Sequence, residues 1–465
     1  MLNSVLDSID AAQAKSRQNL FDLLKFKSIG TDPAFAAECR AAAGWLVAYL
    51  KAMGLAAQTH ETSGQPAVIG QWGEGRKGLP HVLFYGHYDV QPVDPLSLWH
   101  TPPFEPRIGQ TARGVEAIFG RGTSDDKGQL MTFLEAIRLW LAAHGSLPFR
   151  LTVLIEGDEE GDSSHLDRFL KAKGKALKAD IAFVCDTEMW DEKTPAITTS
   201  LRGCIAEDVT VTGPALDLHS GYFGGPAVNP LKVLSSLVAK LHGANGRIAI
   251  PGFYDGVKPV SKRRLAQWKK LGLSESHFLG EVGLRHAAGE KGKSLAEQLW
   301  ARPTAEVNGL WGGYTAEGRK TVLPAKAEAK FTFRLVEGQN PAKCRAAFRR
   351  FMRASLPPDC RISFAAHGGD STGIAVDEQN PWIGAAAAAL KDEWGTPAAL
   401  VGSGVSIPVV ESFRKHQKME SLLVGFARFD DAAHSPNEKY DVESYHRGTR
   451  SWARLIGKIA EGKWK

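Results

Sequence analysis

Five short segments of the chain carry histidines and acids in patterns that suit metal binding. The first reads FYGHYDVQP, in which His87 and Asp89 follow an apolar run and lie two residues apart. Side chains alternate along an extended chain, so these two would point the same way. One could then ligate a metal while the other fixes its orientation. Taken alone, the segment is better explained by a buried histidine in a hydrogen bond.

The next two segments are rich in carboxylates. GRGTSDDKG places Asp125 and Asp126 at the start of an expected helix, where capping and the helix dipole alone would account for both acids. VLIEGDEEGDSSH crowds five acids into seven residues, and such a cluster repels itself without a cation. Glu159 and Glu160 could divide the roles of general base and metal ligand. A solvated acidic loop is the alternative explanation.

The last two segments complete a set of ligands. Asp186 follows the apolar run in FVCDTEMW, and His434 lies in the polar loop DDAAHSPNEKYD. Two histidines and several carboxylates, without thiolates, suit zinc, or manganese in its place. A pair of divalent ions also needs a bridging carboxylate, and hydrolysis needs a separate base for the shared water. The chain offers candidates for each role.

Alternating strands and helices are expected to position these segments. Apolar runs at 81–90, 149–156 and 181–185 alternate with amphipathic helices at 129–143 and 166–172. This alternation predicts an α/β domain with a mostly parallel sheet flanked by helices. In such sheets the loops that leave the carboxyl ends of strands build the active site, and most of the candidate residues fall in those loops.

A second, smaller α+β domain is expected beyond residue 202, where the pattern changes. Its strands and helices are predicted at 207–212, 229–241, 321–323, 330–335 and 342–353, with a charged helical stretch at 258–303.

The chain then returns to the first pattern. A helix at 381–394 and strands at 406–410 and 422–425 would extend the first sheet. The first domain is therefore expected to be discontinuous, formed by 1–202 and 370–465, with 203–369 inserted into it.

Composition and charge exclude several classes of protein. The 465 residues are 43% hydrophobic and 23% charged, and no window approaches the roughly 18 apolar residues that cross a bilayer. The net charge of +6 is small and spread along the chain, so nucleic acid is not an expected partner. Five separated cysteines form no C-x-x-C pair, which argues against disulfides and a thiolate zinc site. The amino terminus lacks signal-peptide features, so we expect a cytoplasmic protein.

The chain resembles a known metallopeptidase family over nearly its whole length. GHYDV, GRGTSDDKG, EGDEEG, VCDTEMW and AHSPNEK are similar, in order and spacing, to motifs of the family that contains carnosine-type dipeptidases, glutamate carboxypeptidase, succinyl-diaminopimelate desuccinylase and acetylornithine deacetylase. PAITTSLRG, DLHSGYFGG, KTVLP, FTFRLVEGQ and SIPVV are most similar to the carnosine-type dipeptidase branch. The resemblance implies a two-metal amide hydrolase whose inserted domain acts as a lid and in dimerisation.

The resemblance also implies a role for each residue of the metal centre. Asp89 would orient a ligand, and Glu159 would be the general base. One ion would be bound by His87 and Asp186 and the other by Glu160 and His434, with Asp125 bridging both. The resemblance also implies a cis peptide bond from Asp125 to Asp126, and zinc or manganese as the metal.

Four further residues match the family's substrate contacts. His219 would donate to the oxyanion in the active site of the partner subunit, which requires a homodimer. Arg334 would clamp the terminal carboxylate of the substrate with its planar guanidinium. Thr321 and Ser406 match additional contacts to the substrate.

Two hydrolytic activities stay open at this point. The preferred one is cleavage of dipeptides or short peptides with a free carboxyl end, and the alternative is deacylation of an N-acyl amino acid, since Arg334 would serve both. A non-catalytic scaffold is a remote third reading, because no ligand or base is missing.

Relatives commonly carry an acid and two glycines before the SIP-like segment, whereas this chain reads GSGVSIP, with Ser403 and Val405. That departure affects substrate detail and leaves the metal centre untouched.

Overall fold

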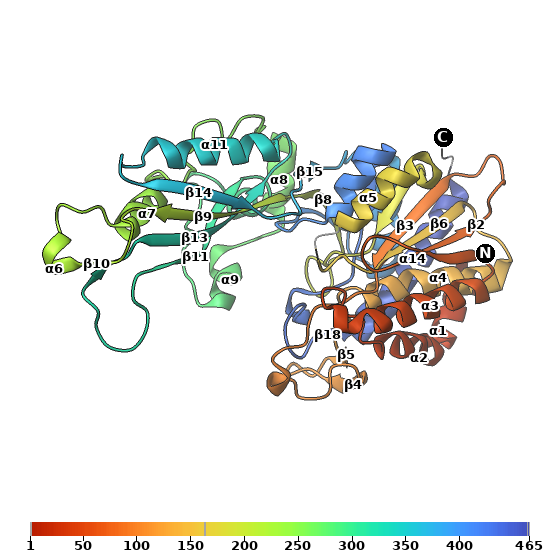
Figure 1. The fold of residues 1–465 in the computed structure, drawn as a ribbon. Helices are drawn as coiled ribbons and strands as arrows, with labels where there is room; N and C mark the ends of the chain where they lie inside the picture. Colours follow the sequence, from red (N-terminus) through yellow and green to blue (C-terminus); the bar gives the residue numbers. More distant parts are fainter. Residues whose placement is uncertain (1, 162–163, 463, 465) are drawn as a thin grey trace. The chain divides into compact units, whose positions relative to one another are not determined.

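The computed structural model describes residues 2–161, 164–462 and 464. Its chain forms two compact units, coloured along the sequence in Figure 1. The first unit comprises Met1–Thr199, Val376–Val401 and Val409–Lys465, and the second comprises Ser200–Ala375 and Gly402–Pro408. The segment 402–408, which the sequence placed in the first domain, therefore packs within the second unit.

The first unit is built on a sheet whose central strands are parallel. The strand order is β1-β2-β6-β3-β7-β17-β8, with β16 also paired with β8. The parallel neighbours are β6 (Arg150–Glu156), β3 (His81–His87), β7 (Ile181–Val184) and β17 (Ser421–Leu423). The outer strands are β1 (Ala56–His60), β2 (Ala67–Trp72), β8 (Ala196–Leu201) and β16 (Ala399–Gly402). Burial on both faces explains the continuous apolar sequences of β6, β3 and β7. The mostly parallel α/β sheet expected from the sequence is confirmed.

Helices surround this sheet (Figure 1). They are α1 (Leu2–Ala11), α2 (Gln13–Leu24), α3 (Ala36–Ala52), α4 (Lys127–His144), α5 (Ser164–Lys173), α12 (Pro381–Trp394) and α14 (Val442–Glu461). α4 packs against β3 and α14. The ring of Trp452, on α14, lies 5.3 to 6.1 Å from those of Phe84, Phe133, Phe183 and Phe426. This aromatic cluster fixes α4, and with it the acidic loop that precedes the helix, against the strands.

The second unit has a core of its own. Its antiparallel sheet has the order β11-β13-β9-β14, formed by β11 (Thr304–Gly312), β13 (Lys326–Leu335), β9 (Gly203–Thr212) and β14 (Arg361–Ala366). Buried and partly exposed residues alternate along β9, because only one face of the sheet is covered. The covering helices are α7 (Pro230–Ala239) and α11 (Pro341–Ala354), as Figure 1 shows. β10 (Leu218–His219) and β12 (Val322–Leu323) form a separate pair, followed at β10 by α6 (Ser220–Phe223).

Smaller elements complete the two units. In the first, β4 (Arg107–Gln110), β5 (Glu116–Phe119) and β18 (Lys439–Asp441) form a three-stranded sheet. In the second, β15 (Ile374–Ala375) pairs with the end of β8.

One expected element was wrong, and another is helical only in part. The strand expected at 406–410 is instead the start of α13 (Pro408–Ser412), because Pro408 has no N–H to donate to a sheet. The stretch at 258–303 holds three short α-helices, α8 (Lys262–Lys270), α9 (Glu275–Phe278) and α10 (Leu295–Trp300), and a 3-10 turn at Gly280–Val282. Gly272, Gly283 and Gly292 lie between them with φ of 70°, 76° and 79°, a left-handed backbone that ends helical structure.

Among the helices of the described residues, none has the length and apolar content needed to span a membrane. All five cysteines are free thiols, as their spacing indicated.

Candidate metal centre

The candidate metal ligands of the first unit lie together at the carboxyl ends of its parallel strands. His87 is the last residue of β3 and is fully buried. Its Nε2 atom lies 3.1 Å from Oδ1 of Asp125. Asp186 follows β7 after a single intervening residue, and its carboxylate approaches both of these residues within the span of one metal site. His87 and Asp186 thus meet at the ends of neighbouring strands, as the sequence predicted, whereas Asp125 reaches them from the loop before α4.

Asp125 belongs to a second group of three ligands. Its Oδ2 atom lies 2.9 Å from Nε2 of His434, and the same Nε2 lies 3.2 Å from Oε2 of Glu160. Each group offers nitrogen and oxygen ligands whose atoms lie within 4.8 Å of one another. The two oxygens of Asp125 thus face different groups, which is the arrangement that a bridging carboxylate requires. The peptide bond from Asp125 to Asp126 is cis.

Asp89 connects the histidine to the acidic loop. Nδ1 of His87 lies 3.1 Å from the carbonyl oxygen of Asp89 and 3.5 Å from its Oδ1 atom. The Asp89 carboxylate also accepts the backbone N–H groups of Glu159, at 3.2 Å, and Glu160, at 3.0 Å. Contact with Nδ1 leaves Nε2 of His87 for a metal. Asp89 therefore fixes both the orientation of the His87 imidazole and the backbone position of the loop that carries the expected base.

The electrostatics of the cluster favour a bound cation. Burial, together with Glu160 and Asp125, raises the pKa of Glu159 to about 7. Burial and Asp125 also raise the pKa of Asp186 well above its usual value. Hydrogen bonds to Asp125 and Glu160 raise the pKa of His434 to about 10. Carboxylates this close resist ionising together unless a positive charge lies among them. The donor types and this charge balance both fit divalent ions such as zinc.

Glu438 holds the loop that carries Asp125, and sequence reasoning missed it. This fully buried carboxylate accepts the backbone N–H groups of Gly122, Ser124 and Asp125 at 2.8 to 3.0 Å. Its Oε2 atom also lies 2.8 Å from Nη1 of Arg121. The signal was present in the sequence, because Arg121 lies in the GRG segment and Glu438 in the NEK segment.

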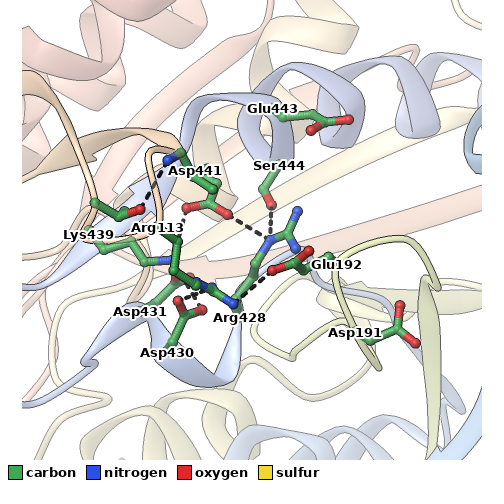
Figure 2. A network of polar contacts seen from close by, with 12 residues as sticks. Arg113, Asp191, Glu192, Arg428, Asp430, Asp431, Lys439, Asp441, Glu443 and Ser444 are labelled. Carbon is green, nitrogen blue, oxygen red and sulfur yellow. Dashed lines mark hydrogen bonds and ion pairs between the residues drawn. The ribbon is translucent and has the colours of Figure 1, made fainter.

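A polar network lies beside the loop that carries His434 (Figure 2). Nζ of Lys439 lies 2.7 Å from Asp431 and 2.8 Å from Asp441, while Nε of Arg428 lies 2.9 Å from Asp441. Asp431 also accepts a hydrogen bond from the hydroxyl of Ser124 at 2.7 Å. The network therefore ties the carboxyl-terminal segment to the residue that precedes Asp125.

The predicted substrate contacts lie in the second unit, at two places. His219 is exposed on β10, and its Nδ1 atom accepts the N–H of Gly221 at 3.0 Å, so its Nε2 atom is the one that carries a proton when the ring is neutral. Thr321 lies beside it, because its carbonyl accepts the N–H of Ser220 at 3.0 Å. Arg334, on β13, donates from Nη1 to the hydroxyl of Ser406 at 3.0 Å. The structure thus pairs His219 with Thr321 and Arg334 with Ser406.

Comparison with known proteins places the chain among metal-dependent peptidases. The model of peptidase family M20/M25/M40 matches residues 83–458. The chain is 30% identical to the Cys-Gly metallodipeptidase DUG1 of Candida albicans, over 97% of this chain and 96% of that protein. It is 28% identical to the human Beta-Ala-His dipeptidase, over 85% and 78%. The structure of the dipeptidase Dug1p from Saccharomyces cerevisiae superposes with a TM-score of 0.83 at 27% identity and covers 99% of both chains.

Proposed function

The chain belongs to peptidase family M20/M25/M40 and is a metallopeptidase, as its motifs indicated, and we propose that it hydrolyses dipeptides or other short peptides with a free carboxyl end. The position of Asp125 carries this proposal, because its two oxygens face two separate groups of metal ligands. Relatives named for Cys-Gly and Beta-Ala-His dipeptides support the substrate class.

In this proposal the ligand groups would hold two divalent ions, zinc or manganese. His87 and Asp186 would hold one, Glu160 and His434 the other, and Asp125 belongs to both groups. When bound, the ions would supply polarisation of the scissile carbonyl and a lowered pKa of the attacking water.

Glu159 is the proposed general base. It takes a proton from the attacking water and later returns it to the leaving amine. Its backbone is held by Asp89, which also contacts His87, so the base and a ligand share one support. A fixed distance between base and ligand favours proton transfer without rearrangement of the site.

The second unit supplies the proposed substrate contacts. Arg334 binds the terminal carboxylate of the substrate, and Ser406, which accepts one of its N–H groups, fixes its guanidinium. His219 donates from Nε2 to the oxyanion of the tetrahedral intermediate. Thr321 lies beside His219 and adds a hydroxyl for substrate contact.

The enzyme in this proposal is a homodimer in which His219 acts on the partner's substrate. Apolar side chains exposed on the second unit support such an interface. Val307, Leu310 and Trp311 are 39 to 43% exposed on β11, which is an edge strand of its sheet. An exposed apolar edge is a common site of pairing between subunits.

The proposal is tested by metal analysis of the purified protein together with a panel of dipeptides, N-acetyl amino acids and N-succinyl amino acids, with and without chelator. Two metal ions per chain and chelator-sensitive cleavage of dipeptides are expected. Cleavage of acyl substrates alone would instead assign a deacylase. A protein that binds no metal and hydrolyses nothing after reconstitution with zinc or manganese would contradict both.

A further inference from the structure

Two arginines of the second unit share one short loop. Arg202 donates from Nε to the carbonyl of Gly404 at 3.0 Å, and its own N–H donates to the carbonyl of Val405 at 3.2 Å. Arg334 donates to the hydroxyl of Ser406 at 3.0 Å. Arg202 also lies two residues before Cys204, the residue that pairs with Arg334 across the sheet. Both guanidinium groups therefore hydrogen-bond to the loop 402–408, at residues only two positions apart.

Neither guanidinium is neutralised by the protein. Among residues 2–161, 164–462 and 464, no carboxylate forms an ion pair with Arg202 or Arg334. A guanidinium has five N–H groups, and each of these side chains uses only one in a hydrogen bond to a described residue. Half-buried arginines normally bind a carboxylate or phosphate. Because no carboxylate of the described residues does so here, most N–H groups of Arg202 and Arg334 are left for a ligand.

The two charges also repel each other. Burial, followed by the charge of Arg334, lowers the pKa of Arg202 to about 10, so Arg202 is still protonated at neutral pH. Glu306 attracts Arg202, but its effect is smaller than that of Arg334. One bound carboxylate leaves one of the two positive charges unmatched, whereas two carboxylates match both.

We infer that the enzyme prefers substrates whose carboxyl-terminal residue is acidic, with Arg334 binding the terminal carboxylate and Arg202 the side-chain carboxylate. The inference rests on the proposed function, since it assumes that Arg334 holds the carboxyl end of a peptide. Aspartate and glutamate place two carboxylates on one residue, at the short separation that neighbouring guanidinium groups can bind together. Arg202 is thereby assigned as the residue that sets specificity for the leaving amino acid.

The test compares kcat/KM for Gly-Glu with Gly-Gln, and for Gly-Asp with Gly-Asn, because each pair differs in charge and hardly in shape. We expect the wild-type enzyme to prefer the acidic member by about tenfold or more, as a charge-assisted hydrogen bond would give. Arg202→Gln should reduce this ratio to near one, and Arg202→Lys should restore part of it. A loss of structure alone would lower the rates for both members equally and would not change the ratio.

Two further variants separate local from general effects. Arg361→Gln removes the same charge from an exposed position on β14 and should keep the wild-type ratio. Gly404→Ala should lower the ratio while keeping both arginines, because a Cβ there would lie 2.8 Å from Nη2 of Arg202 and displace it.

The outcomes also distinguish this inference from the proposed function. Hydrolysis of neutral and acidic dipeptides at equal rates would overturn the acidic preference and leave the dipeptidase activity standing. Equal losses on both substrates in Arg202→Gln would likewise overturn it, since Arg202 would then act on the terminal carboxylate or on the loop. Failure to cleave any dipeptide would remove the proposed function and this inference with it.

Discussion

The carboxylate of Glu438 accepts the backbone N–H of Asp125 at 3.0 Å, although 313 positions separate the two residues in the chain. The segment that holds His434 therefore also holds the loop that carries the shared ligand. One buried side chain therefore links the loop of Asp125 to the segment of His434, and both residues belong to the second candidate metal site.

Replacing Glu438 with glutamine should weaken both stability and metal binding. The amide can accept fewer of the three backbone N–H groups and leaves the buried Arg121 without its charge partner. Breaking a buried ion pair typically costs about 3–5 kcal/mol in free energy of unfolding. Urea unfolding and zinc competition with a chelator would measure the two effects. Glu443→Gln, an exposed helical position, should change stability by less than about 0.5 kcal/mol, and equal stability of both variants would contradict the role of Glu438.

Glu159→Gln should separate metal binding from catalysis. Glutamine has almost the same shape but cannot accept a proton from the attacking water, so kcat should fall by roughly 10²–10⁴-fold or more. Metal content should stay at the wild-type value, because the ligand groups do not include Glu159. Elemental analysis and steady-state kinetics on one preparation would check both. Near-normal turnover would remove Glu159 from the mechanism.

Metal removal should destabilise the protein. Without cations, the acids around Asp125 repel one another, whereas metal at about 100 times its dissociation constant would add roughly 2.7 kcal/mol to the free energy of unfolding. Thermal unfolding with chelator and with excess zinc would measure the difference. Asp125→Asn lacks the shared carboxylate and should show a much smaller response to zinc. An identical response in that variant would argue against a shared ligand.

Mixed dimers should reveal whether His219 acts across subunits. Neither His219→Ala nor Glu159→Gln alone should be active, but a mixed dimer would contain one complete site. Random exchange of equal amounts would therefore recover about a quarter of the wild-type activity in a twofold dimer. Activity after mixing, compared with each variant alone, is the measurement. If exchange occurs without any recovery, the two residues serve the same subunit.

The parallel strands were predictable because each is an uninterrupted apolar run that ends in polar residues. His87, Asp186 and the acids after β6 fall at those ends, so the sheet itself explains why they meet. The positions of Asp125 and His434 could not be derived in this way. They lie in loops, and their approach depends on long-range hydrogen bonds such as those made by Glu438.

The two departures from the predicted secondary structure have local causes. At 406–410 the apolar residues suggested a strand, but Pro408 favours the first turn of a helix, where its missing N–H has no cost. The stretch 258–303 was expected to be helical and charged, but three glycines with positive φ divide it into short helices. Pro408 lacks the N–H that a strand needs, and the glycines adopt a left-handed backbone that ends a helix, so in both places single residues outweighed the periodicity of their neighbours.

The loop 402–408 belongs to the second unit, yet the chain reaches it only after residues 376–401 of the first. A gene fragment encoding 200–375 would thus carry Arg202 and Arg334 without Gly404 and Ser406, the residues to which they donate hydrogen bonds. Exchange of the single continuous segment 200–375 between relatives would transfer the two arginines but not the loop to which they donate hydrogen bonds. Chimeras that aim to move substrate preference from one enzyme to another therefore need two grafts rather than one.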